Sequence, residues 1–174
     1  VLKYDRKIII EELIDDVLEY NISILKTNDK LYISSIEEIE TNLEYRDYVD
    51  KCNLENYLNG NIVRTVPAKI SEKMNEEIID LAKKTINFLN NTGLSRIDFL
   101  YDKKKKELYV DEINSIPSCF SHHLWEDANI SYKELFNIMI SDTIKNINKD
   151  SEMITTMDMD VLKDLKNSDI KEFK

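Results

Sequence analysis

The sequence of 174 residues contains only two glycines, two prolines and two cysteines. Cys52 and Cys119 do not form a metal-ligand spacing, and so few cysteines fit a reducing compartment better than a disulfide-rich secreted scaffold. The two glycines, Gly60 and Gly93, lie far apart and cannot form a glycine-rich loop that cradles phosphate. The composition therefore excludes a disulfide scaffold and a glycine-rich phosphate loop within this chain.

Long apolar runs and an excess of positive charge are also absent. No stretch approaches the roughly 18 apolar residues of a membrane span and no signal peptide is recognisable, so we expect a cytoplasmic protein. Lys and Arg total 24 against 34 Asp and Glu, a net charge of −10, which disfavours nucleic acid and anionic membranes as partners. A ligand that carries phosphate remains compatible, because a metal ion and a few placed cations are enough to bind it.

The remaining composition is that of a folded protein, because 42% of the residues are hydrophobic. We expect an α+β domain at residues 1–148 and a charged tail at 149–174. Residues 41–61 are broken in pattern and polar, which predicts a long loop. Hydrophobic periodicity predicts strands at 7–13, at 18–25 and from residue 31, with a turn at 28–30.

Two helices are predicted from their capping residues. The first begins at the N-cap Ser71 and ends before Gly93, which stands where a C-terminal cap belongs. The second begins with the capping box formed by Ser131 and Glu134. The residues expected to be buried are Met74, Ile78, Leu81, Ala82, Thr85, Phe88 and Leu89 in the first helix, and Leu135, Ile138, Met139 and Ile147 in the second.

Two alternating stretches, SRIDFLY at 95–101 and YVDEINSIP at 109–117, flank the lysine-rich link DKKKKE and predict an antiparallel hairpin. Alternation places Leu108, Val110, Glu112 and Asn114 on one face and Tyr109, Asp111 and Ile113 on the other. Across the hairpin, Asp98 and Arg96 fall on the face of Glu112 and Asn114.

Two carboxylates and an amide at this spacing are hard oxygen ligands that suit Mg²⁺ or Mn²⁺ together with phosphate. The same pattern also fits a solvated sheet face on which Arg96 pairs with one of the carboxylates. His122 and His123 are a less suitable metal pair, because adjacent histidines point apart and no third ligand has a fitting spacing.

In this order, the motifs resemble the C-terminal part of the D-alanine–D-alanine ligases and their relatives among the ATP-grasp enzymes. The resemblance runs from about residue 4 to residue 147. It rests on the segments YDRKIIIEELI, LEYNISIL, YRDYVDKC at 45–52, VPAKIS, GLSRIDFLY and YVDEINSIP. It implies the C-terminal subdomain of an ATP-grasp fold, with a mostly antiparallel sheet and flanking helices.

The resemblance also implies a role for individual residues. Glu11, with Glu12 as the alternative, would contact the adenine of ATP, and Glu19 would hold its ribose. Lys51 would reach the transferred phosphate, while Arg96 would neutralise the phosphoryl group and the tetrahedral intermediate. The remaining roles are those of the metal ligands Asp98, Glu112 and Asn114, and of the backbone amide of Ser118 beside the intermediate.

Three positions depart from the pattern of the family. Ser118 replaces the usual glycine after the proline, and His123 stands where the family has a serine that binds the carboxylate of the second substrate. Cys52 replaces the usual tyrosine of the loop. The stretch Leu124-Trp125-Glu126, followed by NISYKEL, resembles a divergent ligase-like branch more than the housekeeping enzymes of the family.

The resemblance predicts an ATP-dependent carboxylate–amine ligase that acts through an acyl phosphate with Mg²⁺. Its substrates would be D-alanine or a relative, for peptidoglycan synthesis and cell wall biogenesis. The alternatives are a non-catalytic relative that binds nucleotide or metal and an interaction domain with an acidic hairpin face. The presence of Asp98, Glu112 and Asn114 favours the enzyme.

The glycine-rich phosphate loop of the family and its N-terminal domain match positions that would precede Val1. We therefore expect a C-terminal fragment with negligible ligase activity by itself. Its partner would be the N-terminal part of the same protein, and a homodimer is compatible with the complete enzyme.

Overall fold

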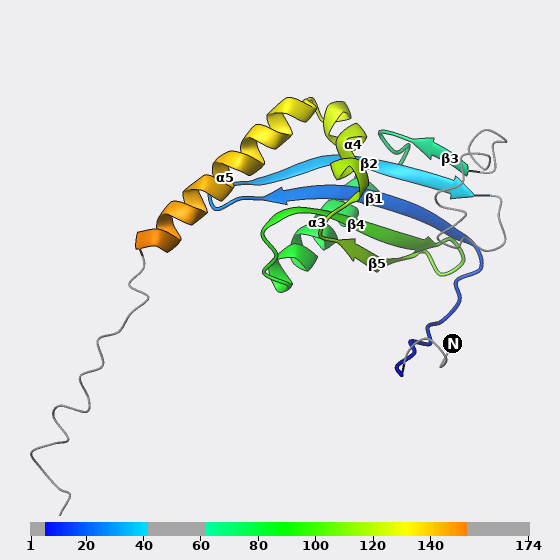
Figure 1. The fold of residues 1–174 in the computed structure, drawn as a ribbon. Helices are drawn as coiled ribbons and strands as arrows, with labels where there is room; N and C mark the ends of the chain where they lie inside the picture. The colour runs from blue at the N-terminus through cyan, green and yellow to red at the C-terminus, as the bar shows by residue number, and fades with distance from the viewer. Residues whose placement is uncertain (1–5, 42–61, 153–174) are drawn as a thin grey trace, which may run out of the picture. The chain divides into compact units, whose positions relative to one another are not determined.

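The computed structural model describes residues 6–41 and 62–152. Five strands form one antiparallel sheet in the order β3-β2-β1-β4-β5 (Figure 1). The strands are β1 (Val17–Lys26), β2 (Leu31–Thr41), β3 (Ile62–Thr65), β4 (Gly93–Asp102) and β5 (Glu107–Asn114). The helices are α3 (Glu72–Phe88), the short 3₁₀ helix η1 (Ser118–Ser121), α4 (His122–Asp127) and α5 (Tyr132–Glu152). The predicted α+β architecture and antiparallel sheet are confirmed.

One face of the sheet packs against α3 and forms the larger hydrophobic core. Ile22 of β1 and Ile97 of β4 are register partners at its centre, and both are fully buried. The helix contributes Ile78, Ala82 and Ile86, which recur at helical spacing and are buried against these strands. This face is therefore dry and carries no part of the chemistry predicted for the hairpin.

The predicted N-terminal cap of α3 is confirmed, but the predicted C-terminal cap is wrong. Ser71 is the N-cap, and its hydroxyl oxygen accepts a hydrogen bond from the Met74 amide at 3.2 Å, as expected. The helix ends at Phe88, and Asn90 with a φ of 49° follows it, whereas Gly93 begins β4. The prediction of Gly93 as the cap is wrong because an asparagine adopts the left-handed conformation earlier in the chain.

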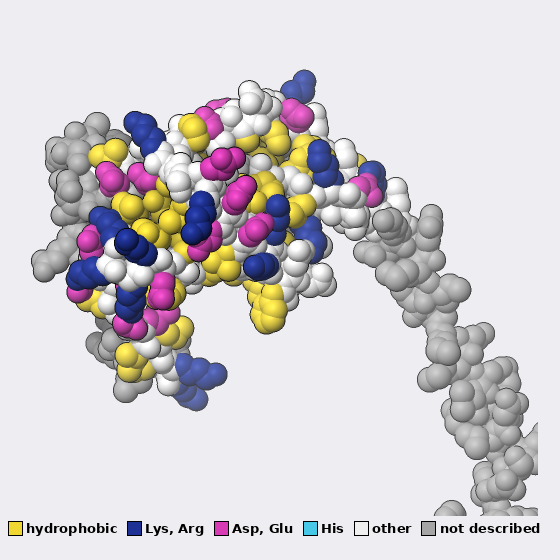
Figure 2. All heavy atoms as spheres, turned by 180° about the vertical axis from the view of Figure 1, so that it is seen from behind, with side chains coloured by type: hydrophobic (Ala, Val, Ile, Leu, Met, Phe, Trp, Pro, Cys, Tyr) yellow, Lys and Arg dark blue, Asp and Glu magenta, His cyan; other side chains and the backbone are white. Residues whose placement is uncertain are grey.

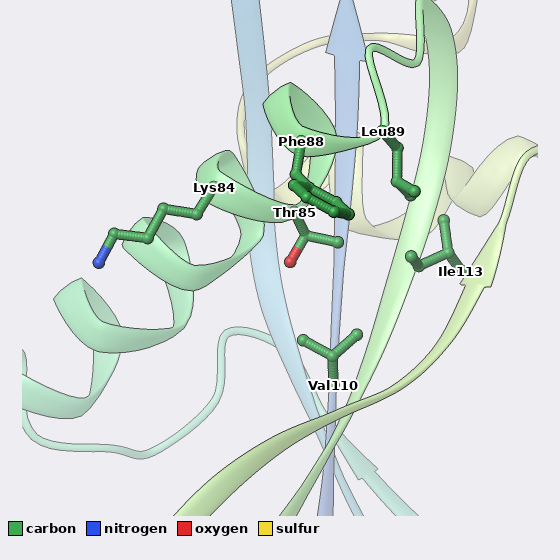
Figure 3. A pocket seen from close by; sticks show the side chains of 6 residues that line it. All are labelled: Lys84, Thr85, Phe88, Leu89, Val110 and Ile113. Atoms are coloured by element: carbon green, nitrogen blue, oxygen red, sulfur yellow. The ribbon is translucent and has the colours of Figure 1, made fainter.

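The buried face of α3 is also rotated relative to the prediction. Ile86 is 1% exposed, whereas Phe88, predicted to be buried, is 89% exposed. Phe88 and Leu89 instead line a shallow apolar groove with Val110 and Ile113 of β5, bordered by Lys84 and Thr85 (Figure 3). Phe88 is exposed because it follows the buried Ile86 by two residues, which places it about 200° further around the helix.

A β-bulge in the hairpin corrects the predicted assignment of faces. Glu112 is opposite Asp98, but Phe99, the next residue of β4, is opposite Val110, so the register shifts at Asp111. The extra residue moves Val110 to the face of α3, together with Ile113, the partner of Ile97. Glu112 and Asn114 therefore share a face with Asp98 and Arg96, as predicted, but Leu108 and Val110 do not.

The opposite face of the sheet is closed at one end by a second, smaller core. Trp125 of α4 is fully buried beside Leu25, Leu94 and Leu135. Its indole Nε1 donates to the hydroxyl of Ser23 at 3.1 Å, so the polar edge of the ring is satisfied as well. This contact fixes α4 over one end of a face that is otherwise polar.

The apolar segment 7–13 is not the buried strand that its composition predicted. Its residues lie outside the sheet, and Ile9 and Ile10 are 86% and 88% exposed. Both edges of β1 are occupied by β2 and β4, so the segment finds no open edge there for backbone pairing.

Helix α5 begins as predicted, because the Ser131 hydroxyl accepts from the Glu134 amide at 3.3 Å and Leu135 is fully buried. The first compact unit ends at Met139, and the residues from Ile140 onward form a second unit. Ile147 of that unit is 61% exposed, so its predicted burial is wrong, because the described part of that unit contains only helix. No helix within the described ranges is long and apolar enough to span a membrane.

Seen from behind, the molecule shows acidic and basic side chains intermixed with hydrophobic ones (Figure 2). Among the coloured residues, no single acidic region stands out in this view.

The rotation of α3 gives a direct test of the core. We expect Ile86→Ala to lower the free energy of unfolding by about 2–5 kcal/mol, because it opens a cavity against the sheet. Phe88→Ala, two residues away on the exposed side, should change it by no more than about 0.5 kcal/mol. Chemical denaturation of both variants measures the difference, and equal losses would contradict the observed helix face.

Candidate functional site

A row of polar side chains crosses the sheet on the face opposite α3. Glu37, Asn21, Asp98 and Glu112 lie on β2, β1, β4 and β5, and each is the register partner of the next. A second row, one step along the strands, contains Ser23, Arg96 and Asn114. The hairpin prediction is confirmed in its strand pairing and in the shared face of Asp98, Glu112, Asn114 and Arg96.

Asp98 forms the centre of this face and is fully buried. Both of its carboxylate oxygens are bound by Arg96, with Nε donating to Oδ1 at 2.6 Å and Nη2 to Oδ2 at 2.8 Å. The hydrogen bond to Asp98 is the main cause that raises the pKa of Arg96, and the charges of Glu19 and Glu37 act in the same direction. The guanidinium is thus held permanently charged beside the carboxylate, a bidentate geometry that lysine could not reproduce.

The amide of Asn114 connects the two carboxylates of the hairpin. In one orientation its Nδ2 lies 3.4 Å from Oδ2 of Asp98. In the reversed orientation Nδ2 donates to Oε1 of Glu112 at 3.0 Å, and Oδ1 accepts from Nη2 of Arg96 at 3.2 Å. The reversed orientation satisfies both ends of the amide, and we prefer it for that reason.

The chemical types of these side chains, two carboxylates and an amide, are those that bind hard divalent cations in proteins. Within residues 6–41 and 62–152, no three His, Cys, Asp or Glu side chains come together as a metal-binding group. The hairpin instead offers two carboxylates, Asp98 and Glu112, directly opposite each other, and an amide oxygen on Asn114. Mg²⁺ is commonly held by one or two carboxylates and completed by substrate oxygens.

Glu37 is a second buried carboxylate, only 2% exposed, at the β2 end of the row. Nδ2 of Asn21 donates to its Oε2 at 3.3 Å, while Nη1 of Arg64 lies 3.6 Å from its Oε1. Burial acts to raise the pKa of Glu37, but the hydrogen bond with His123 and the positive charge of Arg64 outweigh it and hold the pKa below its usual value. Glu37 is therefore kept as an anion despite its burial.

The partner of Glu37 on α4 is His123, whose Nε2 lies 3.3 Å from Oε1 of the carboxylate. The histidine follows a turn in which Cys119, Phe120 and Ser121 all have positive φ values, between 48° and 52°. Left-handed backbone is uncommon for residues other than glycine, and three in succession mark a segment held by its surroundings. The turn and the buried Trp125 together place His123 at the edge of the polar face.

The structure brings only some of the other predicted residues to this face. Glu19 lies on β1 beside it, opposite Leu100, and its charge acts on Arg96. Ser118 is exposed directly after Pro117. Lys51, and the loop predicted around it, lie outside the described residues.

The two candidates for adenine binding lie in the extended segment before β1. Glu11 is exposed and outside the sheet. Glu12 pairs with Lys105 of the hairpin turn at 3.0 Å, and the neighbouring acids Asp15 and Asp16 pair with Lys104 and Lys103. The lysine-rich turn therefore contacts this segment, and neither glutamate reaches the polar row.

Sequence analysis missed Asn21 and Glu37. A signal was present, because Glu19, Asn21 and Ser23 are polar at every second position of an otherwise apolar strand. Such a stripe on the buried half of a sheet indicates a polar face that continues on the neighbouring strands. Glu37 could be identified only once the register of β2 against β1 was known.

The family of the chain is shown by comparison with known sequences. Residues 1–141 match the family model described as D-ala D-ala ligase C-terminus. The chain is 34% identical over 138 residues to the D-alanine–D-alanine ligase of Thermosipho africanus, covering 79% of this chain and 36% of that enzyme. It is 33% identical over 150 residues to that of Acetivibrio thermocellus, covering 84% and 38%. The chain thus spans less than half of the length of these relatives.

Solved structures support the same fold. D-alanyl-alanine synthetase A of Vibrio cholerae superposes with a TM-score of 0.59 at 23% identity, covering 74% of this chain and 39% of that structure. The D-alanine-D-alanine ligase of Coxiella burnetii gives a TM-score of 0.60 at 18% identity, covering 79% and 34%. With five antiparallel strands, flanking helices and a family match over most of its length, the chain belongs to the D-alanine–D-alanine ligase family, within the C-terminal ATP-grasp region.

Proposed function

We propose that the chain forms the C-terminal half of the active site of an ATP-dependent ligase that joins the carboxylate of D-alanine, or a related amino acid, to an amine. The observation that carries the proposal is the row in which Asp98 and Glu112 face each other beside Arg96. A concentration of paired charges on one sheet face is unnecessary for folding, whereas phosphoryl transfer requires it.

In this reaction the carboxylate of the first substrate attacks the γ-phosphorus of ATP, which forms an acyl phosphate and releases ADP. The amine of the second substrate then attacks the acyl carbon, the bond to the phosphate oxygen breaks, and inorganic phosphate leaves. Both steps build negative charge on oxygens. Arg96 lies only 23% exposed at the centre of the face, where a fixed guanidinium can stabilise that charge.

Asp98, Glu112 and Asn114 would hold Mg²⁺ or Mn²⁺ against the nucleotide phosphates. When bound, the metal would neutralise the phosphate oxygens and polarise the phosphorus. Asp98 contributes an anion whose position is already fixed by Arg96, and Glu112 contributes an exposed carboxylate that can adjust to the ligand. Glu19, on the same face, is the candidate for the ribose, while Lys51 and one of Glu11 and Glu12 remain candidates for phosphate and adenine.

The reaction itself is the first test. We expect the natural gene product that contains this chain to release ADP and phosphate only when ATP, Mg²⁺ and D-alanine or a related amino acid are all present. A coupled assay of ADP release over a panel of D- and L-amino acids measures this. Binding of ATP without amino-acid-dependent turnover for any member of the panel would favour the non-catalytic alternative.

The cation site gives a second test. In the same gene product, we expect Glu112→Gln to raise the Mg²⁺ concentration needed for half-maximal turnover by about tenfold or more, because one hard oxygen ligand is lost. Stability should hardly change, because the substitution removes one of two neighbouring negative charges.

The control is Asp111→Asn, which makes the same chemical change at the bulged residue next to Glu112. The measurement is the turnover of the wild type, the Glu112→Gln variant and the Asp111→Asn variant as a function of Mg²⁺ concentration. An unchanged metal requirement in the Glu112 variant, or an equal effect in the Asp111 variant, would refute the assignment.

A further inference from the structure

We propose that His123, oriented by Glu37, accepts the proton that the attacking amine must lose, and is thereby a catalytic residue of amide formation. This assignment rests on the proposed ligase function and concerns its second step. Three observations support it: the contact between Glu37 and Nε2 of His123, the availability of the second ring nitrogen, Nδ1, to a ligand, and the position of the pair at the end of the polar row.

The chemistry of the second step requires a proton acceptor. An amino acid at neutral pH carries an ammonium group, which has no free electron pair for attack. When this nitrogen forms the amide bond it keeps one of its three hydrogens. One of the two released protons ends on the departing phosphate, which leaves as HPO₄²⁻, and the other must pass to a base.

Three charged groups of the polar face, those of Asp98, Arg96 and Glu37, are poorly suited to that task. The Asp98 carboxylate is bound at both oxygens by Arg96, and Arg96 stays protonated. The pKa of Glu37 is below its usual value, and its carboxylate is 2% exposed, so it is a weak and inaccessible base. An imidazole at the edge of this face is the more suitable acceptor.

His123 has the geometry of an oriented general base. Its Nε2 contacts Oε1 of Glu37 at 3.3 Å, and no residue in the described part of the chain binds Nδ1. Its side chain is 38% exposed, so Nδ1 can reach a ligand and later return the proton to solvent. A carboxylate that holds one ring nitrogen and leaves the other for the reactant is the usual way in which proteins fix an imidazole for proton transfer.

Two further groups hold the carboxylate of the pair in place. Arg64 of β3 and Asn21 of β1 bind the same carboxylate, so Glu37 is fixed from both neighbouring strands. On its own helix, His123 faces only the ring of His122, with centroids 6.0 Å apart. Oδ1 of Asn21 is buried without a hydrogen-bond partner in the described structure and offers an acceptor toward the same region.

The spacing suits two reactants between the two ends of the row. Glu37 and Asp98 are two strands apart, which corresponds to about 10 Å across the sheet. The leaving phosphate beside Arg96 and the amine beside His123 would occupy this interval. The acyl carbon would then lie between a guanidinium that stabilises the leaving phosphate and a base that deprotonates the nucleophile.

The test separates the two chemical steps in the natural gene product. Hydroxylamine is uncharged at neutral pH and traps an acyl phosphate as a hydroxamate without needing a base. We expect His123→Gln to lower amide formation at saturating amino acid by about 10²-fold or more, with hydroxamate formation within about threefold of the wild type. His122→Gln, which changes the neighbouring ring that contacts the Cys119 carbonyl, is the matched control and should leave both rates unchanged.

Glu37→Gln tests the positioning role. We expect a fall in the rate of amide formation of about tenfold, again without loss of hydroxamate, and partial recovery in Glu37→Asp. Glu40→Gln, the same change at an exposed position of β2, is the control. If Glu37→Gln fails to fold in a thermal melt, the His123 and Glu37→Asp variants still decide the question.

Three results would overturn the assignment. Equal losses of amide and hydroxamate in His123→Gln would mean that the residue acts before the amine arrives. A change in KM for the amine alone, with kcat unchanged, would make it a binding residue. A wild-type protein that forms no hydroxamate with any amino acid would contradict the proposed ligase function, and this assignment with it.

Discussion

The arrangement of the polar face depends on the ion pair between Arg96 and Asp98, because a fully buried carboxylate is tolerated only when its charge is compensated. The two side chains are separated by one residue on the same strand, so the pleat of β4 is sufficient to bring them together. With its charge balanced, Asp98 can occupy the middle of a row that runs through Asn21 to Glu37 on one side and to Glu112 on the other. Removal of Arg96 would leave the Asp98 carboxylate buried and uncompensated, which is far more costly than loss of an exposed pair.

The sheet separates stability from chemistry by its two faces. The face under α3 is closed by isoleucines and Phe99 and provides most of the buried apolar surface. The opposite face carries the charges, and it is anchored at one end by Trp125, which packs on Leu25 and Leu94 and binds Ser23. This anchor holds α4 in register with the sheet, and the Glu37–His123 contact extends that order toward the open part of the face. Rigid placement of charged groups is what electrostatic catalysis requires, since groups that must reorganise lose much of their effect.

The chain belongs to the D-alanine–D-alanine ligase family, and it combines the expected hairpin with a contact between His123 and Glu37. The hairpin retains an arginine, two carboxylates and an amide on one face, the set that phosphoryl transfer demands. The histidine belongs to a network that joins three strands and one helix, in which Glu37 contacts Asn21, Arg64 and His123. A network of this kind couples the β2–β3 edge of the sheet to the segment that follows Pro117.

Local patterns in the sequence determined the hairpin, the alternating strand β1, the N-caps Ser71 and Ser131, and the shared face of Arg96 and Asp98, because each depends on residues near one another in the chain. The tertiary structure alone decided the rest. Alternation predicted Val110 on the same face of the sheet as Glu112. The bulge at Asp111 places Val110 on the opposite face, because an inserted residue switches the face of the strand residues that follow it. Segment 7–13 reads as a strand yet lies outside the sheet, because a strand exists only where another offers its edge. Glu37 and His123 are 86 positions apart and come into contact only because β2 pairs with β1 and α4 packs over both strands. Local hydrophobic periodicity cannot predict a contact at this separation in the sequence.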